Sequence, residues 1–337
     1  VFLRSTVYGK IKTGAARIKR RFTMFFERIR KKNFIRSTAA ATAAAAMIAS
    51  GIFFTGASDV AIQNDVLSRR TLNAAVEAEL ESRGLRAYPN QAVTVYVDGE
   101  QYEGTTLLID GTTFVGIREF TMLCEDATVE WVGTEKAVYV TNPRVAIKAV
   151  NSTEYIMSNG RYFWGVKENF IENGTMYVPI RAIASAFGMT VSWNDGEFAA
   201  YVSRGDGTVT QWYEYYNGDE VYWLSKIIEA ESRGEPMRGK IAVGNVVLNR
   251  VRSPEFPDTI YSVIFDREYG VQFSPVADGS IGRDASAESV IAAKLCLEGY
   301  SVSDSVLYFI NASAAQDFWV PRHRPYVTTI GNHDFYA

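Results

Sequence analysis

The sequence predicts an α+β multidomain protein in which a β-rich, internally repeated domain precedes a mainly helical domain. Apolar and polar residues alternate through residues 93–203 between Asp-Gly and Asn-Gly turns, a pattern typical of strands and hairpins. Helical spacing of apolar residues takes over after Asp219. At 337 residues, the chain is long enough for both domains and an N-terminal extension.

The charged residues divide the chain into a basic start and an acidic remainder. Residues 1–36 contain 12 of the 35 Lys and Arg residues and one of the 38 Asp and Glu residues. The remaining 23 basic and 37 acidic side chains give the rest of the chain a balance of −14. Nucleic acid phosphates would repel such a surface, so we expect no nucleic-acid partner.

Residues 1–61 have the order of an export signal. A cluster of Arg and Lys is followed by an uncharged run over residues 37–58, as in a secretory signal peptide. We expect the basic residues to stay in the cytoplasm and the later domains to be exported. Membrane contact is expected only through this segment, as a signal cleaved before Ser58 or as an anchor over residues 37–58. An ordinary signal length would place the start at Met24.

An internal repeat in residues 93–203 follows a predicted connector helix within residues 62–92. The predicted unit is a strand, a helix and two strands. Trp131 and Trp193 occupy equivalent positions, which favours core packing over a role as sugar-stacking platforms. The matching segments are residues 113–118 with 176–181, 128–131 with 190–193, and 139–141 with 201–203.

The helical domain is expected to begin, after a linker over residues 204–219, with an amphipathic helix. Its apolar residues recur every three or four positions up to Ile228, and Glu231 continues that buried stripe. Burial disfavours an ionised carboxylate and raises its pKa, so Glu231 is predicted to donate a proton near neutral pH. The alternative is a buried ion pair with Arg233 or Arg250.

Two neighbouring glutamates rank below Glu231. Glu229 projects from another face of the helix, and Glu235 lies beyond Gly234, where helical geometry is expected to fail.

Residues 220–337 are predicted to contain two further helices, over residues 236–252 and 287–297, with residues 261–265 and then a loop over residues 268–282 between them. The loop and the C-terminal tail are rich in aromatic and amide side chains, which suit contact with a sugar.

We expect no disulfide, metal site or cofactor. Cys124 and Cys296 fall in separate domains, and each is interpreted as a small buried apolar residue. The chain contains only two histidines, His323 and His333, without the ligand spacing of a zinc site.

Residues 222–337 resemble the catalytic domain of SleB-type cell-wall hydrolases, the family of spore cortex-lytic enzymes. The resemblance rests on the ordered blocks WLSKIIEAESRGEPMRGKIAVGNVVLNRV, FPDTIYSVIF, QFSPVADG and a tail from YFIN to IGNHDFY. It implies a lysozyme-like fold, peptidoglycan glycan strands as the substrate and Glu231 as the catalytic acid. The implied reaction cleaves the β-1,4 bond between N-acetylmuramic acid and N-acetylglucosamine as a lytic transglycosylase. We expect the substrate-binding residues to be Ser232, Gln272, Phe273, Tyr308, Trp319, His323 and His333.

Residues 93–203 resemble the N-terminal stalk-like domain of copper amine oxidases, on a doubled V-x-I-R…T-V-x-W…Y-V pattern. Because two histidines are too few for that oxidase's copper site, we expect only an accessory module. Cortex-lytic enzymes usually carry a peptidoglycan-binding module of helical repeats in this place. The sequence therefore leaves open whether the substrate is spore cortex or vegetative wall.

Other roles remain open on the sequence alone. A hydrolytic muramidase needs a second carboxylate, for which Asp278 is the best candidate, although its A-D-G setting favours a turn. An N-acetylmuramoyl-L-alanine amidase would need converging metal ligands. A non-catalytic cell-wall-binding surface protein would hold glycan without cleaving it.

Overall fold

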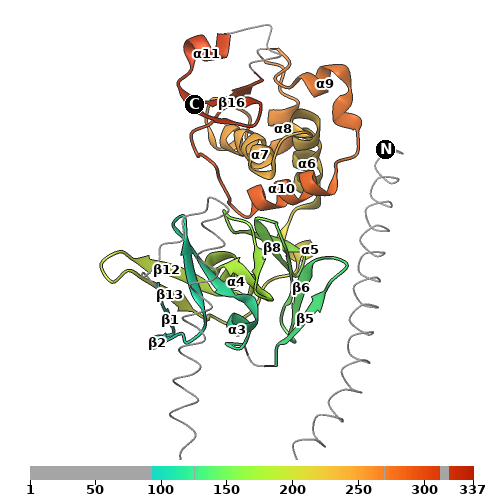
Figure 1. The fold of residues 1–337 in the computed structure, drawn as a ribbon. Helices are drawn as coiled ribbons and strands as arrows, with labels where there is room; N and C mark the ends of the chain where they lie inside the picture. The colour runs from blue at the N-terminus through green and yellow to red at the C-terminus, as the bar shows by residue number, and fades with distance from the viewer. Residues whose placement is uncertain (1–92, 125, 269, 312–318) are drawn as a thin grey trace, which may run out of the picture. The chain divides into compact units, whose positions relative to one another are not determined.

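The computed structural model describes most of the chain after residue 92, namely residues 93–124, 126–268, 270–311 and 319–337. A β-rich region is followed by a largely helical region (Figure 1). The predicted signal segment and connector helix lie outside the described residues. No helix in the described ranges is both long and apolar enough to cross a membrane.

The β-rich region consists of short strands and short helices joined mainly by tight turns. Its elements are β1 (Thr94–Val97), β2 (Glu100–Gln101), β3 (Thr106–Ile109), β4 (Thr112–Gly116), α3 (Ile117–Thr121), β5 (Thr128–Val132), β6 (Ala137–Thr141), β7 (Ala146–Val150), β8 (Tyr155–Ser158), β9 (Arg161–Trp164), β10 (Phe170–Glu172), β11 (Thr175–Pro179), α4 (Ile180–Ala186), β12 (Thr190–Asn194) and β13 (Ala199–Ser203).

These strands pair into sheets with the orders β12-β13-β1-β2, β10-β11-β4-β3 and β5-β6-β7-β8-β9. The two ends of the region meet, because β1 and β13 pair in parallel with Thr94 opposite Ala199. The segments β4-α3-β5-β6 and β11-α4-β12-β13 have the same order of elements. That order is the strand, helix and two strands expected of each unit.

The core of the β-rich region follows from the alternation in its sequence. In β1 and β3 every second side chain is buried, as expected for strands with one face toward a core. Val115, Val178 and Ile183 are completely buried in that core. The expectation of core tryptophans is wrong for Trp131, which is 45% exposed, whereas Trp193 is partly buried against the core.

The helical region is a set of packed helices with a small C-terminal sheet of order β14-β16-β15. Its elements are α5 (Trp212–Tyr215), α6 (Gly218–Ser232), α7 (Met237–Arg252), α8 (Ile260–Ile264), α9 (Ser274–Asp278), the 3₁₀ helix η1 (Ser280–Gly282), α10 (Ala287–Leu297), β14 (Tyr308–Ile310), α11 (Trp319–His323), β15 (Tyr326–Ile330) and β16 (His333–Tyr336).

Helices α6, α7 and α10 contact one another around a common core. Leu224 and Ile227 of α6, Val243 and Val247 of α7 and Leu295 of α10 are completely buried in it. The apolar stripes predicted from helical spacing therefore face one another, which is the arrangement that buries them most effectively.

Three segments differ from expectation. The predicted loop over residues 268–282 contains α9 and η1, because Pro275 suits a first helical turn and Gly279, with φ of +80°, ends it. The predicted linker contains α5, and α6 begins within it at Gly218. The C-terminal tail, for which no strands were predicted, contributes a sheet of order β14-β16-β15.

The cysteines carry no disulfide in the described residues. Cys296 is buried between α7 and α10, where burial raises the pKa of its thiol, and Cys124 is only partly buried. The expectation of a small buried residue is thus confirmed for Cys296 and wrong in degree for Cys124.

The β-rich and helical regions belong to one compact unit and contact each other through polar and aromatic side chains. Arg161 of β9 donates two hydrogen bonds to the Glu298 carboxylate, at 2.8 Å and 2.6 Å, and both side chains are largely buried. Tyr216 donates a third at 2.5 Å. Lys294 of α10 donates to the Gly160 carbonyl at 3.0 Å. Bidentate, shielded pairs of this kind hold their geometry better than surface ion pairs do.

Substitution of Gly244 tests how closely α7 packs against α6 and α10. A Cβ atom there would lie 2.6 Å from Cys296 Sγ and 3.0 Å from Ile228 Cδ1. We expect Gly244→Ala to lower the midpoint of thermal unfolding by about 2–8 °C, because overpacking outweighs the gain in helix propensity. Calorimetry of the purified chain measures the shift. Gly218→Ala, in open space on α6, is the control, and an equal loss in both variants would contradict the packing.

Candidate active site

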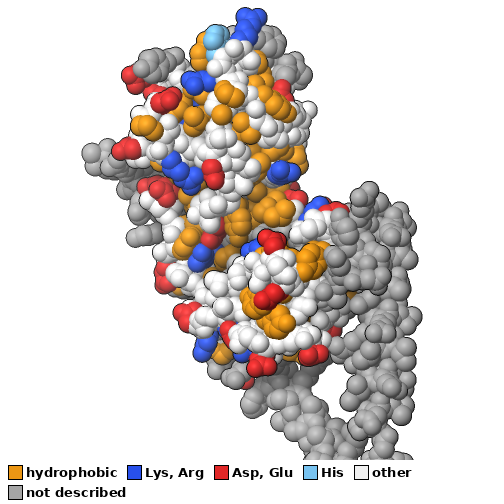
Figure 2. All heavy atoms as spheres, turned by 90° about the vertical axis from the view of Figure 1, so that its left-hand side faces the viewer, with side chains coloured by type: hydrophobic (Ala, Val, Ile, Leu, Met, Phe, Trp, Pro, Cys, Tyr) orange, Lys and Arg blue, Asp and Glu red, His pale blue; other side chains and the backbone are white. Residues whose placement is uncertain are grey.

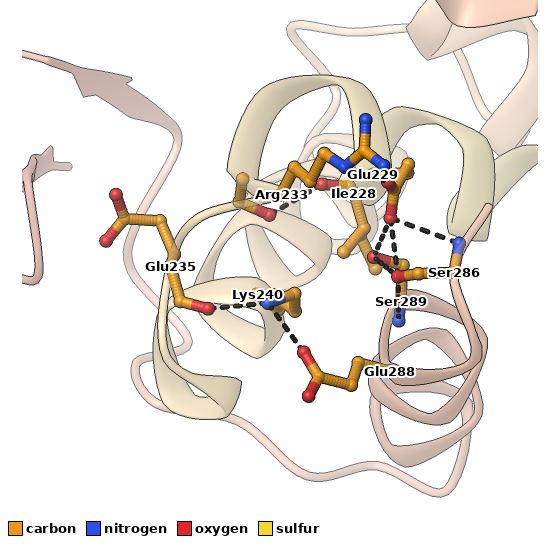
Figure 3. Close-up of polar contacts among 9 residues, drawn as sticks. Ile228, Glu229, Arg233, Glu235, Lys240, Ser286, Glu288 and Ser289 are labelled. Atoms are coloured by element: carbon orange, nitrogen blue, oxygen red, sulfur yellow. Dashed lines mark hydrogen bonds and ion pairs between the residues drawn. The ribbon is translucent and has the colours of Figure 1, made fainter. Parts of the chain in front are cut away.

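Three glutamates in and just beyond the last turn of α6 have different surroundings, and Glu229 is the first. Its Oε2 accepts hydrogen bonds from Ser286 N at 3.1 Å, Ser286 Oγ at 2.6 Å and Ser289 Oγ at 2.8 Å, while Arg233 lies 3.1 Å away (Figure 3). Burial alone would raise the pKa of Glu229, but these hydrogen bonds and the Arg233 charge outweigh it and hold the pKa below its ordinary value. Glu229 is therefore an ionised anchor to the start of α10.

Glu235 lies beyond the end of α6, as the sequence predicts, and is also satisfied. Its carboxylate accepts hydrogen bonds from Asn332 N at 3.0 Å and Asn332 Nδ2 at 2.9 Å, with His333 Nδ1 3.8 Å away. Burial raises the pKa of Glu235, but the Asn332 bonds outweigh it and the net pKa is lowered. Gly331 leaves room for this contact, since a Cβ there would lie 1.7 Å from Glu235 Oε2.

The backbone next to Glu235 is fixed as well. Lys240 donates a hydrogen bond to the Glu235 backbone carbonyl at 2.5 Å and forms an ion pair with Glu288 at 3.2 Å. The Glu235 carboxylate points away from Lys240 (Figure 3). The loop after α6 is therefore held by contacts to α10 on one side and to the turn before β16 on the other.

Glu231 stands between these anchors in a different state. It is partly buried, and burial followed by the negative charge of Asp278 raises the pKa of Glu231 to about 7. The predicted ion-pair alternative is not found in the described residues: Arg233 pairs with Glu229, and Arg250 donates to the Leu307 carbonyl at 2.8 Å. A carboxyl group with a pKa near neutrality is able both to donate and to accept a proton.

Asp278 is the last residue of α9, which contacts α6. Its Oδ1 accepts a hydrogen bond from Ser280 N at 2.7 Å, so the predicted turn role is confirmed. The bonds from Ser280 lower the pKa of Asp278, and the side chain is exposed. The surroundings thus move the two pKa values in opposite directions: Asp278 is ionised at neutral pH, whereas Glu231, with a pKa of about 7, is protonated in about half of the molecules.

Four of the predicted substrate-binding residues are connected, through successive side-chain contacts, with two arginines. The Arg250 guanidinium lies over the rings of Phe273, at 5.1 Å, and Tyr308, at 5.3 Å. Arg324 donates to Tyr308 Oη at 2.7 Å and lies 5.7 Å from the Trp319 ring. His323 stacks on Trp319, with ring centroids 4.8 Å apart. Phe273, at one end of these contacts, is buried, whereas the Trp319 indole near the other end is 47% exposed.

The other predicted substrate-binding residues lie elsewhere. Ser232 is buried, and its hydroxyl donates to the Ile228 carbonyl at 2.6 Å. His333 is buried against Phe309 and beside Glu235. Gln272 is partly exposed and directly precedes Phe273. Their contact with a substrate stays a prediction.

From the sequence, Arg250 was expected only as an ion-pair partner of Glu231, and no role was expected of Arg324. Arg250 lies three residues after Val247 and seven after Val243, on the buried stripe of α7. The spacing that singled out Glu231 therefore also marks Arg250 as a buried charge. Arg324 follows α11 and carries no comparable signal.

Comparison with known families identifies both regions. A family model described as Cell Wall Hydrolase matches residues 234–336, and one described as Copper amine oxidase N-terminal domain matches residues 96–202.

Two curated relatives are spore cortex-lytic enzymes. The enzyme of Oceanobacillus iheyensis is 34% identical over 120 residues, which are 36% of this chain and 42% of the relative. The enzyme of Bacillus subtilis is 32% identical over 120 residues, 36% of this chain and 38% of the relative. The chain thus matches less than half the length of each. A solved structure, the catalytic domain of the germination-specific lytic transglycosylase SleB from Bacillus anthracis, is 34% identical. The match covers 36% of this chain and 97% of that one, with a TM-score of 0.33.

The raised pKa of Glu231 predicts a pH-dependent effect on stability. Because the folded chain binds this proton more tightly than the unfolded chain, the stabilisation present at low pH is lost as pH rises through about 7. We expect Glu231→Gln, which cannot ionise, to raise the unfolding temperature at about pH 8 and to change it little at about pH 4.

Thermal unfolding of parent and variant at both pH values measures this effect. Glu229→Gln is the matched control. Since the pKa of Glu229 is lowered, this variant should lose stability at the higher pH. An equal shift of Glu231→Gln at both pH values would contradict a buried, protonated Glu231.

Proposed function

Because the chain carries a cell wall hydrolase domain behind a copper amine oxidase N-terminal-like domain, we propose that it cleaves peptidoglycan glycan strands as a lytic transglycosylase. The bond is the β-1,4 linkage between N-acetylmuramic acid and N-acetylglucosamine. The observation that carries the proposal is Glu231. Of the three glutamates around the end of α6, Glu229 and Glu235 are held ionised by hydrogen bonds, whereas the pKa of Glu231 is raised to about 7.

In the proposed reaction Glu231 donates its proton to the glycosidic oxygen, which leaves with N-acetylglucosamine as a hydroxyl group. The C6 hydroxyl of the muramic acid then attacks C1 and forms the 1,6-anhydro bond. Glu231, now a carboxylate, takes the proton that this hydroxyl releases, so the acid is regenerated. A pKa near neutrality suits both steps.

The remaining parts of the site fit this role. Trp319 provides an exposed indole stacked on His323, and an exposed aromatic face of this kind suits contact with a sugar ring. Arg250 lies over the Tyr308 ring, and Arg324 donates a hydrogen bond to the Tyr308 hydroxyl. We propose a lysozyme-like arrangement for the helical region, and a repeated stalk-like arrangement for the β-rich region.

A hydrolytic muramidase is the second candidate, and Asp278 favours it. The charge of Asp278 acts on Glu231, and a carboxylate beside the acid is what a hydrolytic route through water or a covalent intermediate requires. The two routes differ in their products, because hydrolysis adds water to the muramic acid end.

We propose that both domains act outside the cytoplasm, after export directed by residues 37–58, and contact the membrane only through that segment. The order of basic and uncharged residues supports this location. The names of the relatives point to the spore cortex as the substrate, and the stalk-like module leaves vegetative wall as the alternative.

Glu231→Gln tests the activity. We expect turnover to fall by about a hundred- to ten-thousandfold, because the amide cannot donate the proton. Mass spectrometry of fragments released from purified sacculi and from spore cortex by the full chain is the measurement. Glu220→Gln, on the exposed first turn of α6, is the control.

The products decide among the candidates. Fragments lighter by one water than the hydrolysis products, lost with Glu231→Gln, support the lytic transglycosylase. Hydrated muramic acid ends support the muramidase. Free stem peptides or no release would overturn cleavage of the glycosidic bond.

Asp278→Asn tests the electrostatic coupling. Since Glu231 must be protonated to act, we expect activity to decline as pH rises through about 7. Loss of the Asp278 charge lowers the pKa of Glu231, so this decline should move to lower pH. Rates measured across pH determine it, with Asp284→Asn, an exposed partner of Lys226, as the control. An unchanged profile would contradict the coupling.

A further inference from the structure

A groove of about 1360 Å³ runs where the β-rich region meets the helical region. It is lined by Trp164, Arg181, Trp193 and Phe198 from the β-rich region and by Arg238 and Tyr300 from the helical region. None of these residues belongs to the candidate active site. In Figure 2, hydrophobic side chains gather between the upper and lower parts of the face shown, with acidic and basic side chains at their borders.

Aromatic side chains are held in place within the groove. Trp193 packs edge to face on Phe198, with ring centroids 5.2 Å apart. Its Nε1 donates to Asp195 Oδ1 at 2.6 Å, which fixes the plane of the indole. Phe198 is 37% exposed, and Trp164 and Trp193 are partly buried. A fixed indole that lines a groove, as Trp193 does, is suited to the apolar face of a sugar ring.

The charged groups of the groove balance one another. Lys167 pairs with Asp110 at 3.2 Å, and Arg181 donates to the Val191 carbonyl at 2.8 Å. The lining contains three acidic and three basic side chains, namely Asp110, Glu154, Asp195, Lys167, Arg181 and Arg238. A nucleic acid or a strongly acidic peptide is thus a poor match, whereas a neutral chain of hydroxyl and acetamido groups finds both donors and acceptors.

Val166, on the lining of the groove, has a strained backbone. This β-branched residue has φ of +68° and is 63% exposed. A β-branched side chain in the left-handed region costs conformational energy, and such strain clusters at ligand-binding segments. The strain places an apolar side chain at the surface beside Trp164 and Lys167.

We propose that this groove is a second binding site for the amino-sugar strand of peptidoglycan, separate from the site around Glu231. The proposal rests on the proposed function for the identity of the polymer. The contacts of Arg161 and Lys294 hold the two walls together, so the site exists only in the two-domain protein. The occupant is the glycan strand, and its stem peptides do not contribute.

The repeat supplies a matched pair of variants. Trp193 lines the groove and Trp131, at the equivalent repeat position, does not. In full-length protein carrying Glu231→Gln, so that no strand is cut, we expect Trp193→Ala to weaken binding of peptide-free glycan strands by about tenfold. Trp131→Ala should leave binding within about twofold. Trp193→Phe should restore most of the affinity, which separates stacking from loss of fold.

Fluorine NMR of the same protein labelled with fluorotryptophan locates the strand independently of the active site. Titration with peptide-free strands should shift the Trp193 signal and leave the Trp131 signal in place. Equal losses in both Ala variants, an unmoved Trp193 signal, or a shift caused by free stem peptide would overturn the proposal. If the Trp193 signal shifts but the parent protein releases no glycan fragments, the proposed activity is contradicted and the binding groove is supported. If the parent protein cleaves glycan but the Trp193 signal does not shift, the binding groove is contradicted and the proposed activity is supported.

Discussion

The C-terminal turn of α6 is restrained by two ionised carboxylates, and the candidate site depends on this restraint. Glu229 joins the turn to Ser286 and Ser289 at the start of α10, and Glu235 joins it to Asn332 before β16. Each of these buried carboxylates accepts hydrogen bonds, which offset the cost of removing it from water. Glu231, between them, is partly buried and lies within the influence of the negative charge of Asp278, the two conditions that favour a protonated carboxyl group.

Helical spacing predicted the elements that form the core. The start of α10 was predictable because Ser286 caps it directly before the periodic residues, and Glu231 was predictable because a carboxylate interrupts an apolar stripe. Helix α9 was not, since Pro275 and Gly279 are also typical of loops. Strands β14 to β16 were missed because each is short and is stabilised by pairing with the others.

The parts of the site that sequence could not predict depend on contacts between distant segments. Asn332 reaches Glu235 across 97 positions in the chain, and no local pattern marks such a pair. The internal repeat likewise gave a wrong prediction for one of its two tryptophans. Equivalent positions predict equivalent burial, yet Trp131 is 45% exposed, whereas Trp193 is partly buried against the core and packs on Phe198.

The contacts between the β-rich and helical regions also fix the distance between the β-rich region and the candidate site around Glu231. If the connection over residues 204–219 made no contacts, it would act as a flexible tether. The helical region would then sample every position within the span of that tether. Here Tyr216, within that connection, and Arg161 converge on Glu298. If the β-rich region were held on a polymer, the candidate site around Glu231 would stand at a fixed offset from it, and under the proposed activity the cuts would be spaced by the protein itself.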